Sequence, residues 1–256
     1  MTQTPPFEEL LALIEDRSAA LSEAVAAAPD LEGRVPSCPD WSLRDLVAHL
    51  AKVQRFWAAT VAAGPSDHPP AVADLPAAEP SAAGAPAAEA LAELAAATET
   101  LVSALRKAGP EAGCWAWWAA SGAPVTAGAV ARRQVHEAAV HAYDAQLALG
   151  APQSIPAGIA LDGIAEFVAV IYGSSGPWPH DPVRIGLHAA EGTSWPLELD
   201  SAGAHLVDGT TAVEASLRGP AGELLLALYG RLPLAAVQRE GDQAVLQQLV
   251  EWPPLG

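Results

Sequence analysis

From residue 7 to residue 172, apolar residues recur every three or four positions, which is the period of an amphipathic helix. Ser42 and Asp45 stand three positions apart, as in the capping box that begins a helix. Thr126 and Gly150 fit the start and the end of a later helix. The pattern predicts helices over residues 7–28, 42–63, 87–108, 126–150 and 156–172. In the second of these, the apolar face consists of Leu43, Leu46, Val47, Leu50, Val53 and Trp57.

The pattern changes after residues 173–182, which are rich in glycine, proline and serine. Apolar and polar residues then alternate over residues 183–188, 195–199 and 211–217, as in short strands with one buried face. Two shorter helices are predicted over residues 221–229, ended by Gly230, and 242–252. We therefore expect an α+β protein with a four-helix bundle within residues 1–174 and a smaller α+β domain over residues 181–256. Residues 64–86, rich in proline and alanine, are expected to form a surface loop.

Composition and charge narrow the classes of function. The chain has 13 Lys and Arg against 30 Asp and Glu, a formal net charge of −17, and no run of basic residues. Because nucleic-acid binding depends on clustered cations, no nucleic-acid partner is expected. No apolar stretch approaches the ~20 residues that cross a bilayer, and the N-terminal segment lacks the basic residues of a signal peptide. Cys38 and Cys114 lie outside any paired spacing, so we expect reduced thiols in a cytoplasmic protein with no membrane partner.

Three side chains offer a set of metal ligands. Glu137 and His141 are four positions apart, so they share one face of a predicted helix. His49 lies in another helix of the expected bundle, and bundles build metal sites from side chains on facing helices. Two imidazoles and one carboxylate, with a fourth position open, are typical of catalytic zinc. The spacing therefore favours a metal-dependent enzyme.

The same residues allow other interpretations. Glu137 and His141 also match an ordinary solvated pair on a helix, and His49 alone matches a surface or core histidine. His136 and Asp144 compete as ligands. Asp144, one turn beyond His141, is better placed to orient a ligand imidazole. The sequence contains no nucleophile elbow, dinucleotide-binding glycine motif or phosphate-binding loop, so those three chemistries have no motif to support them.

These segments resemble a known family. SCPDWSLRDLVAHLAKVQRFWAATV (residues 37–61) and RRQVHEAAVHAYDAQLALG (residues 132–150) resemble two motifs of the mycothiol-dependent maleylpyruvate isomerase family, whose N-terminal module is a DinB-like bundle. GPAGELLLALYGRLPLAAVQREGDQAVLQQL (residues 219–249) resembles the family's C-terminal module, which is similar to sterol-carrier-type α+β domains. The likeness covers nearly the whole chain.

The resemblance implies roles for particular residues. It assigns a metal to the same three side chains that the spacing selects. It directs Arg231 toward the active site, where the guanidinium would bind a carboxylate of the thiol or of the substrate. Tyr143 takes the place of a bulky aromatic residue, often tryptophan, and is expected in the wall of the pocket that binds the thiol. The chemistry itself needs only one further acid or base, for which Asp144, His136 and metal-bound water are all candidates.

The resemblance also implies a reaction. The metal would be zinc, and the thiol would be mycothiol, a small thiol of actinobacteria. A thiol at the open position of a metal is held as thiolate. In an isomerase the thiolate would add to the cis double bond of a maleylpyruvate-like electrophile, allow rotation and leave; in an S-transferase the adduct would be the product.

Several alternatives stay open. A metal-hydroxide hydrolase would use the same ligands without a thiol. A non-enzymatic protein would bind a small molecule or lipid in its C-terminal domain. Nickel, iron or manganese can take the place of zinc at such ligands. The partners expected are a small electrophile and a thiol, and the chain is expected to be a monomer or a homodimer.

Overall fold

The computed structural model describes residues 4–71, 86–208 and 212–253, and the chain divides into two compact units. The first unit holds Pro5–Ala116 and Pro124–Gln153, and the second holds Trp117–Ala123 and Ser154–Gly256. This division, near residue 153, comes earlier than the boundary expected near residue 174. The difference arises because helix α5 (Ala157–Glu166) packs against α6 (Ala221–Leu228) within the second unit.

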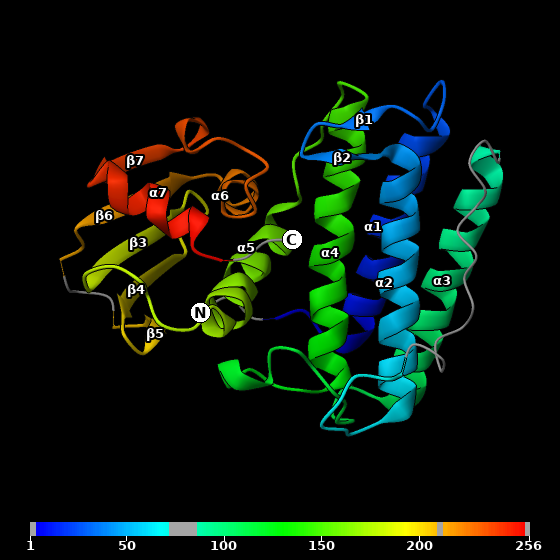
Figure 1. The fold of residues 1–256 in the computed structure, drawn as a ribbon, viewed down its shortest axis with the longest axis horizontal. Coiled ribbons are helices and arrows are strands. Elements are labelled where there is room, and N and C mark those ends of the chain that lie inside the picture. The colour runs from blue at the N-terminus through cyan, green and yellow to red at the C-terminus, as the bar shows by residue number, and fades with distance from the viewer. Residues whose placement is uncertain (1–3, 72–85, 209–211, 254–256) are drawn as a thin grey trace. The chain divides into compact units, whose positions relative to one another are not determined.

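Four long helices form the first unit: α1 (Phe7–Ala26), α2 (Leu43–Ala63), α3 (Ala87–Ala108) and α4 (Ala127–Ala148) (Figure 1). Helix α1 packs mainly against α3 and α4, and α2 packs mainly against the same two helices. The order around the bundle is therefore α1, α3, α2, α4. This order makes α2 and α4 neighbours although α3 lies between them in the sequence, and it confirms the predicted four-helix bundle.

Local signals determine where α2 and α4 begin. Ser42 Oγ accepts a hydrogen bond from the backbone N–H of Asp45 at 3.2 Å, and the Asp45 carboxylate accepts one from the Ser42 N–H at 2.8 Å. The predicted capping box is therefore present. Thr126 Oγ1 accepts from the N–H of Ala129 at 3.3 Å. Because each cap fixes the first residue of its helix, it also fixes the face on which each later residue lies.

The interior of the bundle combines apolar packing with a connected group of polar side chains. Leu50 and Leu94 are fully buried there. Gln54 on α2 is also fully buried: its Nε2 donates to Ser18 Oγ on α1 at 2.9 Å, and its Oε1 accepts from Thr98 Oγ1 on α3 at 2.7 Å. These hydrogen bonds join three of the four helices.

The segment between α1 and α2 forms a hairpin of β1 (Arg34–Val35) and β2 (Cys38–Ser42), which the hydrophobic pattern does not predict. The strands are too short for an alternating pattern to show. Val35 is fully buried in the core of the bundle, and the Leu43 N–H donates to the Gly33 carbonyl at 3.0 Å. The hairpin is therefore attached to the bundle beside the start of α2.

The second unit contains a five-stranded sheet with the order β5-β4-β3-β6-β7. Strands β3 and β6 are parallel, and the other neighbours are antiparallel. Helix α5 continues as a π-helix over Phe167–Tyr172, and α7 (Gln243–Glu251) is the last helix described. The strands are β3 (Val183–Ala189), β4 (Ser194–Asp200), β5 (Gly203–Leu206), β6 (Ala215–Gly219) and β7 (Gln238–Gly241).

Strands β3 and β4 and helices α6 and α7 confirm the predicted elements, and the mixed α+β class is confirmed. The strand predicted over residues 211–217 begins only at Ala215; residue 211 and part of the predicted loop, residues 72–85, lie outside the described residues. Strands β5 and β7 were not predicted, because β7 is exposed along its whole length and β5 exposes its last two residues. Of the helices in the described residues, none combines the length and the apolar character that a membrane span requires.

Candidate metal centre

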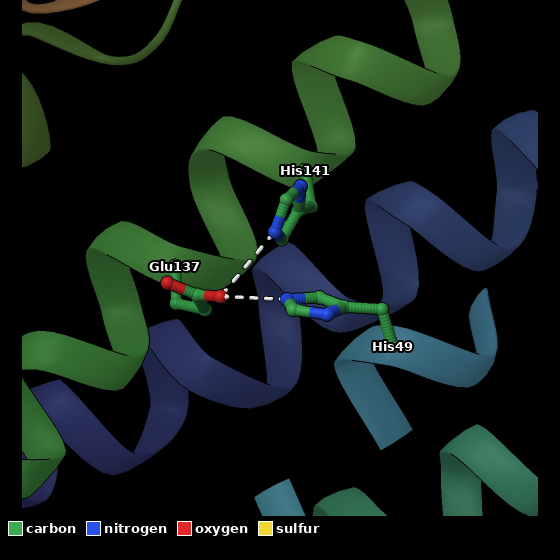
Figure 2. A group of neighbouring side chains, drawn as sticks. All are labelled: His49, Glu137 and His141. Atoms are coloured by element: carbon green, nitrogen blue, oxygen red, sulfur yellow. Dashed lines mark hydrogen bonds and ion pairs between the residues drawn. The ribbon is translucent and has the colours of Figure 1, made fainter. Parts of the chain in front are cut away.

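The bundle brings His49, Glu137 and His141 together, although His49 and Glu137 are 88 positions apart in the sequence (Figure 2). His49 lies on α2, and Glu137 and His141 lie one turn apart on α4. Helices α2 and α4 are neighbours in the bundle, so the imidazole of one helix faces the carboxylate of the other. The three side chains that the spacing selects therefore form one group.

The geometry of this group fits a divalent metal ion. Glu137 Oε1 lies 3.2 Å from His49 Nε2 and 3.3 Å from His141 Nε2, and one ligand atom from each residue lies within 4.8 Å of the other two. Zinc–ligand bonds of about 2.0–2.1 Å around a tetrahedron place neighbouring ligand atoms about 3.3 Å apart. Two of the three separations thus already have the spacing of ligands around zinc.

Hydrogen bonds and neighbouring charges shift the pKa values of Glu137 and His141 in opposite directions. Burial raises the pKa of Glu137, but hydrogen bonds from His141 and His49 and the nearby charge of Arg133 outweigh it, so the pKa falls well below its usual value. Burial lowers the pKa of His141, but hydrogen bonds to Asp144 and Glu137 outweigh it and raise the pKa to about 9. Without a metal ion, the group therefore holds a carboxylate and a proton on His141. A divalent ion would take the place of that proton.

Asp144 lies behind His141 and is completely buried. Its Oδ2 is 3.0 Å from His141 Nδ1, and its Oδ1 accepts a hydrogen bond of 2.6 Å from Ser37 Oγ on the hairpin. The carboxylate contacts the nitrogen of His141 that is remote from Glu137. This is the arrangement in which a carboxylate orients a histidine that binds metal.

Trp41 and Arg133 also contact the group, and Ser37 contacts Asp144 behind it; the sequence did not single out Trp41 or Ser37. Trp41, on β2, lies with its ring centroid 4.6 Å from that of His49. Ser37 contacts Asp144 across 107 positions of sequence. Arg133 Nη2 donates to Glu137 Oε2 at 3.4 Å, as its place one turn before Glu137 suggests. Ser37 and Trp41 both belong to the Ser-Cys-Pro-x-Trp segment, which resembles a family motif and could have indicated that both residues lie near the site.

Other candidate residues lie elsewhere. His136 is buried on α4 and is not part of the ligand group. Tyr143 is buried, and burial and the charge of Asp144 raise its pKa. It follows His141 by two positions, which is about 200° around a helix, so it does not share the face of the ligands. A role for Tyr143 in binding the thiol stays a prediction that the bundle geometry does not favour.

Arg231 belongs to the second unit, where it follows helix α6. Gly230 has a φ of 69°, the Gly230 N–H donates to the Ala227 carbonyl, and the Arg231 N–H donates to the Leu226 carbonyl at 2.7 Å. This is the Schellman motif that ends a helix, and it confirms the predicted end at Gly230. The guanidinium is half-buried and donates to the Tyr229 carbonyl at 3.0 Å. A role for Arg231 in binding a carboxylate stays a prediction.

Comparison with known proteins supports the fold and gives the family. Among curated proteins, none matches this chain. The crystal structure of the mycothiol-dependent maleylpyruvate isomerase is similar to this chain, with 18% sequence identity and a TM-score of 0.61. The match spans 98% of this chain and 97% of the isomerase chain. A histidine-to-alanine mutant of that isomerase is 17% identical over the same shares of the two chains, with a TM-score of 0.64.

Two family models match the sequence in turn. The model of the mycothiol maleylpyruvate isomerase N-terminal domain matches residues 11–146, which include the ligand group. The model of the C-terminal domain of the same isomerases matches residues 158–248. The gap between the two matches contains the division between the two structural units. The chain therefore belongs to the mycothiol-dependent maleylpyruvate isomerase family.

Proposed function

We propose that this protein is a metal-dependent enzyme that uses a small thiol, mycothiol, as the nucleophile toward a small unsaturated acid. The observation that carries the proposal is the convergence of His49, Glu137 and His141 around one carboxylate oxygen. Membership of the family supports mycothiol as the thiol. The two similar crystal structures are those of a mycothiol-dependent maleylpyruvate isomerase and its mutant, which supports isomerisation over S-transfer.

His49 Nε2, His141 Nε2 and Glu137 Oε1 are the atoms that would hold the ion. Two imidazoles and a carboxylate suit zinc, and they leave one position for an exchangeable ligand. When bound, the ion lowers the pKa of a thiol at that position, so that the thiol is present as thiolate at neutral pH. Nickel, iron and manganese bind the same ligand types, so the ion itself must be measured.

The remaining residues prepare these ligands. Arg133 donates to Glu137 Oε2, while Oε1 faces both imidazoles. Asp144 contacts His141 Nδ1, so Nε2 is the nitrogen that faces Glu137. Because Asp144 is completely buried, it suits orienting His141 better than exchanging protons with a substrate. In this proposal Arg231 binds a carboxylate of the thiol or of the substrate.

The reaction needs few groups from the protein. The sulfur of the thiol adds to one carbon of a conjugated cis double bond, and the electron pair moves to the adjacent carbonyl. The former double bond is now single and rotates. Return of the electron pair expels the sulfur and leaves the trans isomer, so the thiol is regenerated and no redox cofactor is consumed.

Three measurements test the proposal. Purified protein is analysed for bound metals, its cobalt-substituted form is titrated with mycothiol, and maleylpyruvate is then supplied with and without the thiol. We expect one ion per chain, a change in the cobalt absorbance on adding thiol, and isomerisation that depends on thiol. Bound metal with thiol-independent hydrolysis of ester or amide substrates would favour the hydrolase alternative. Absence of stoichiometric metal would rule out the proposal and leave the non-enzymatic binding alternative.

A further inference from the structure

Three side chains from two distant segments form a continuous chain behind the ligand group. Ser37 Oγ donates to Asp144 Oδ1 at 2.6 Å, and Asp144 Oδ2 is 3.0 Å from His141 Nδ1. The other nitrogen of that ring, Nε2, lies 3.3 Å from Glu137 Oε1. The hydroxyl of the hairpin is thus connected through one carboxylate to a ligand atom of the candidate metal centre.

The donor and acceptor properties of these groups define the state of the imidazole. A serine hydroxyl has one proton to donate, and an ionised carboxylate only accepts, so the Ser37 proton lies toward Asp144. The same carboxylate accepts a hydrogen bond from His141 only if Nδ1 carries a proton. With Nδ1 kept protonated by Asp144, an ion that takes the place of the Nε2 proton meets the lone pair of a neutral imidazole, on the nitrogen that faces Glu137.

Burial makes this arrangement specific. Asp144 has no exposed surface, so bulk water does not contact its carboxylate and cannot replace the Ser37 hydroxyl without a local rearrangement. A buried carboxylate that loses a hydrogen-bond donor is destabilised, and it lowers that cost by rotating or by admitting water. Either change would disturb the orientation of His141.

The hairpin holds Ser37 firmly in place. Pro36 and Ser37 form the turn between β1 and β2, and the ring of Pro36 fixes its own φ. Val35, just before the turn, is fully buried in the core of the bundle. Across the hairpin, Arg34 Nη1 donates to the Asp40 carbonyl at 3.0 Å. The position of the hydroxyl is therefore determined by packed and hydrogen-bonded backbone.

We infer that Ser37 is a positioning residue of the metal centre: through Asp144 it holds the His141 ring so that Nε2 is presented to the ion. The inference rests on the proposed function, because it assigns a task to the hairpin only if the ligand group binds metal. The inference goes beyond that function because it adds a residue outside the ligand group. In the described hydrogen bonds Ser37 touches none of the three ligands, and it acts through Asp144.

Zinc affinity, measured by competition with a chromogenic chelator, tests the inference. Removing a residue that supports a metal ligand costs about 10- to 100-fold in affinity. We expect Asp144→Asn to lose affinity within that range and Ser37→Ala to lose roughly tenfold, at its lower end. Ser37→Thr keeps the hydroxyl and should retain most of the affinity. If Ser37→Ala does not fold, Ser37→Cys has nearly the same shape and only a weak donor.

A double-mutant cycle separates action through Asp144 from a general effect on folding. If Ser37 acts through Asp144, Ser37→Ala should change zinc affinity far less in the Asp144→Asn background than in the unmodified protein. Ser42→Ala is the matched control, because Ser42 lies in the same hairpin and caps α2 without contacting Asp144 in the described hydrogen bonds. It should lower the melting temperature and leave zinc affinity unchanged.

A spectroscopic measurement gives an independent result. In the zinc-loaded protein, nitrogen-15 NMR should show a proton on His141 Nδ1 that exchanges slowly with water, and Ser37→Ala should speed that exchange. Equal zinc affinity and equal exchange in Ser37→Ala and the unmodified protein would overturn the inference alone. If the unmodified protein binds no divalent ion, the proposed function fails, and the inference fails with it.

Discussion

Arg133 and Glu137 lie one turn apart on α4, and 3.4 Å separates Arg133 Nη2 from Glu137 Oε2. The guanidinium therefore contacts one carboxylate oxygen, and both imidazoles approach the other. The two oxygens of Glu137 thus have different surroundings: one has a fixed cation beside it, and the other is shared by the candidate ligands. A carboxylate held in this way needs little rearrangement to bind an ion through a single oxygen.

Replacing His141 by alanine should remove most of the bound metal. The variant leaves one imidazole and one carboxylate, which are too few protein ligands to hold zinc tightly. Mass spectrometry of the metal content per chain measures the effect. The matched control is His68→Ala, because His68 is exposed and lies outside the ligand group. Full occupancy in the His141 variant would show that the three residues are not the metal site.

Replacing Arg231 by alanine should reduce kcat/KM by roughly tenfold or more, because a charge-assisted hydrogen bond contributes about 1.5–3 kcal/mol. Metal content should stay unchanged, since Arg231 belongs to the other structural unit. Arg239→Ala is the control, because this arginine is exposed on β7 of the same unit. Steady-state kinetics with mycothiol and maleylpyruvate measure both variants. If they have equal kcat/KM, Arg231 only stabilises the end of α6.

Thr98→Val should lower the free energy of unfolding by about 1–3 kcal/mol, because it removes the donor to the buried Gln54 amide and keeps the shape of the side chain. Thr100→Val is a close control. In both residues Oγ1 lies within 3.0 Å of the carbonyl oxygen four residues earlier on α3, but Thr98 directs its single hydroxyl proton to Gln54, whereas Thr100 is exposed and donates to that carbonyl. Urea unfolding followed by circular dichroism gives both values. An equal loss in the two variants would show that the contact with Gln54 contributes nothing to stability.

The two cysteines should differ in their reaction with iodoacetamide. Burial raises the pKa of the Cys114 thiol to about 11, so at pH 8 only about one Cys114 thiol in a thousand is ionised. Cys38 is half-buried on the hairpin. We expect peptide mass spectrometry to find Cys38 alkylated first and Cys114 only as pH rises toward 11 or as the protein unfolds. Equal labelling of the folded protein at pH 8 would contradict the burial of Cys114.

Sequence spacing was sufficient for the helices and for the ligand group. The ligand prediction needed only that Glu137 and His141 share a helix face and that α2 and α4 be neighbours. The first condition follows from the helix period, and the second is met in bundles that build metal sites between facing helices. The Tyr143 prediction came from motif comparison alone and stays a prediction, since the same period places Tyr143 on a different face from His141.

Other features depend on tertiary contacts that no local pattern reports. Strand β7 exposes all its residues, so it has no alternation of buried and exposed positions to detect, and it forms only because β6 offers a free edge. Ser37 and Asp144 are 107 positions apart, and nothing in the sequence around either residue predicts that the two are in contact. The boundary between the two units lies near residue 153 and not near residue 174, because α5 has an apolar face that packs against α6.

The order of helices around the bundle also has a consequence for folding kinetics. Helices α2 and α4 must dock across the whole of α3 and its connections before His49 meets Glu137, 88 positions away. Contacts between such distant positions require the closure of a long loop, which is slow compared with forming a single helix. An intermediate with α4 undocked would hold two ligands on one helix and bind the ion weakly. Stopped-flow refolding with a zinc-sensitive dye would therefore time the docking of α2 against α4, separately from the appearance of helical structure.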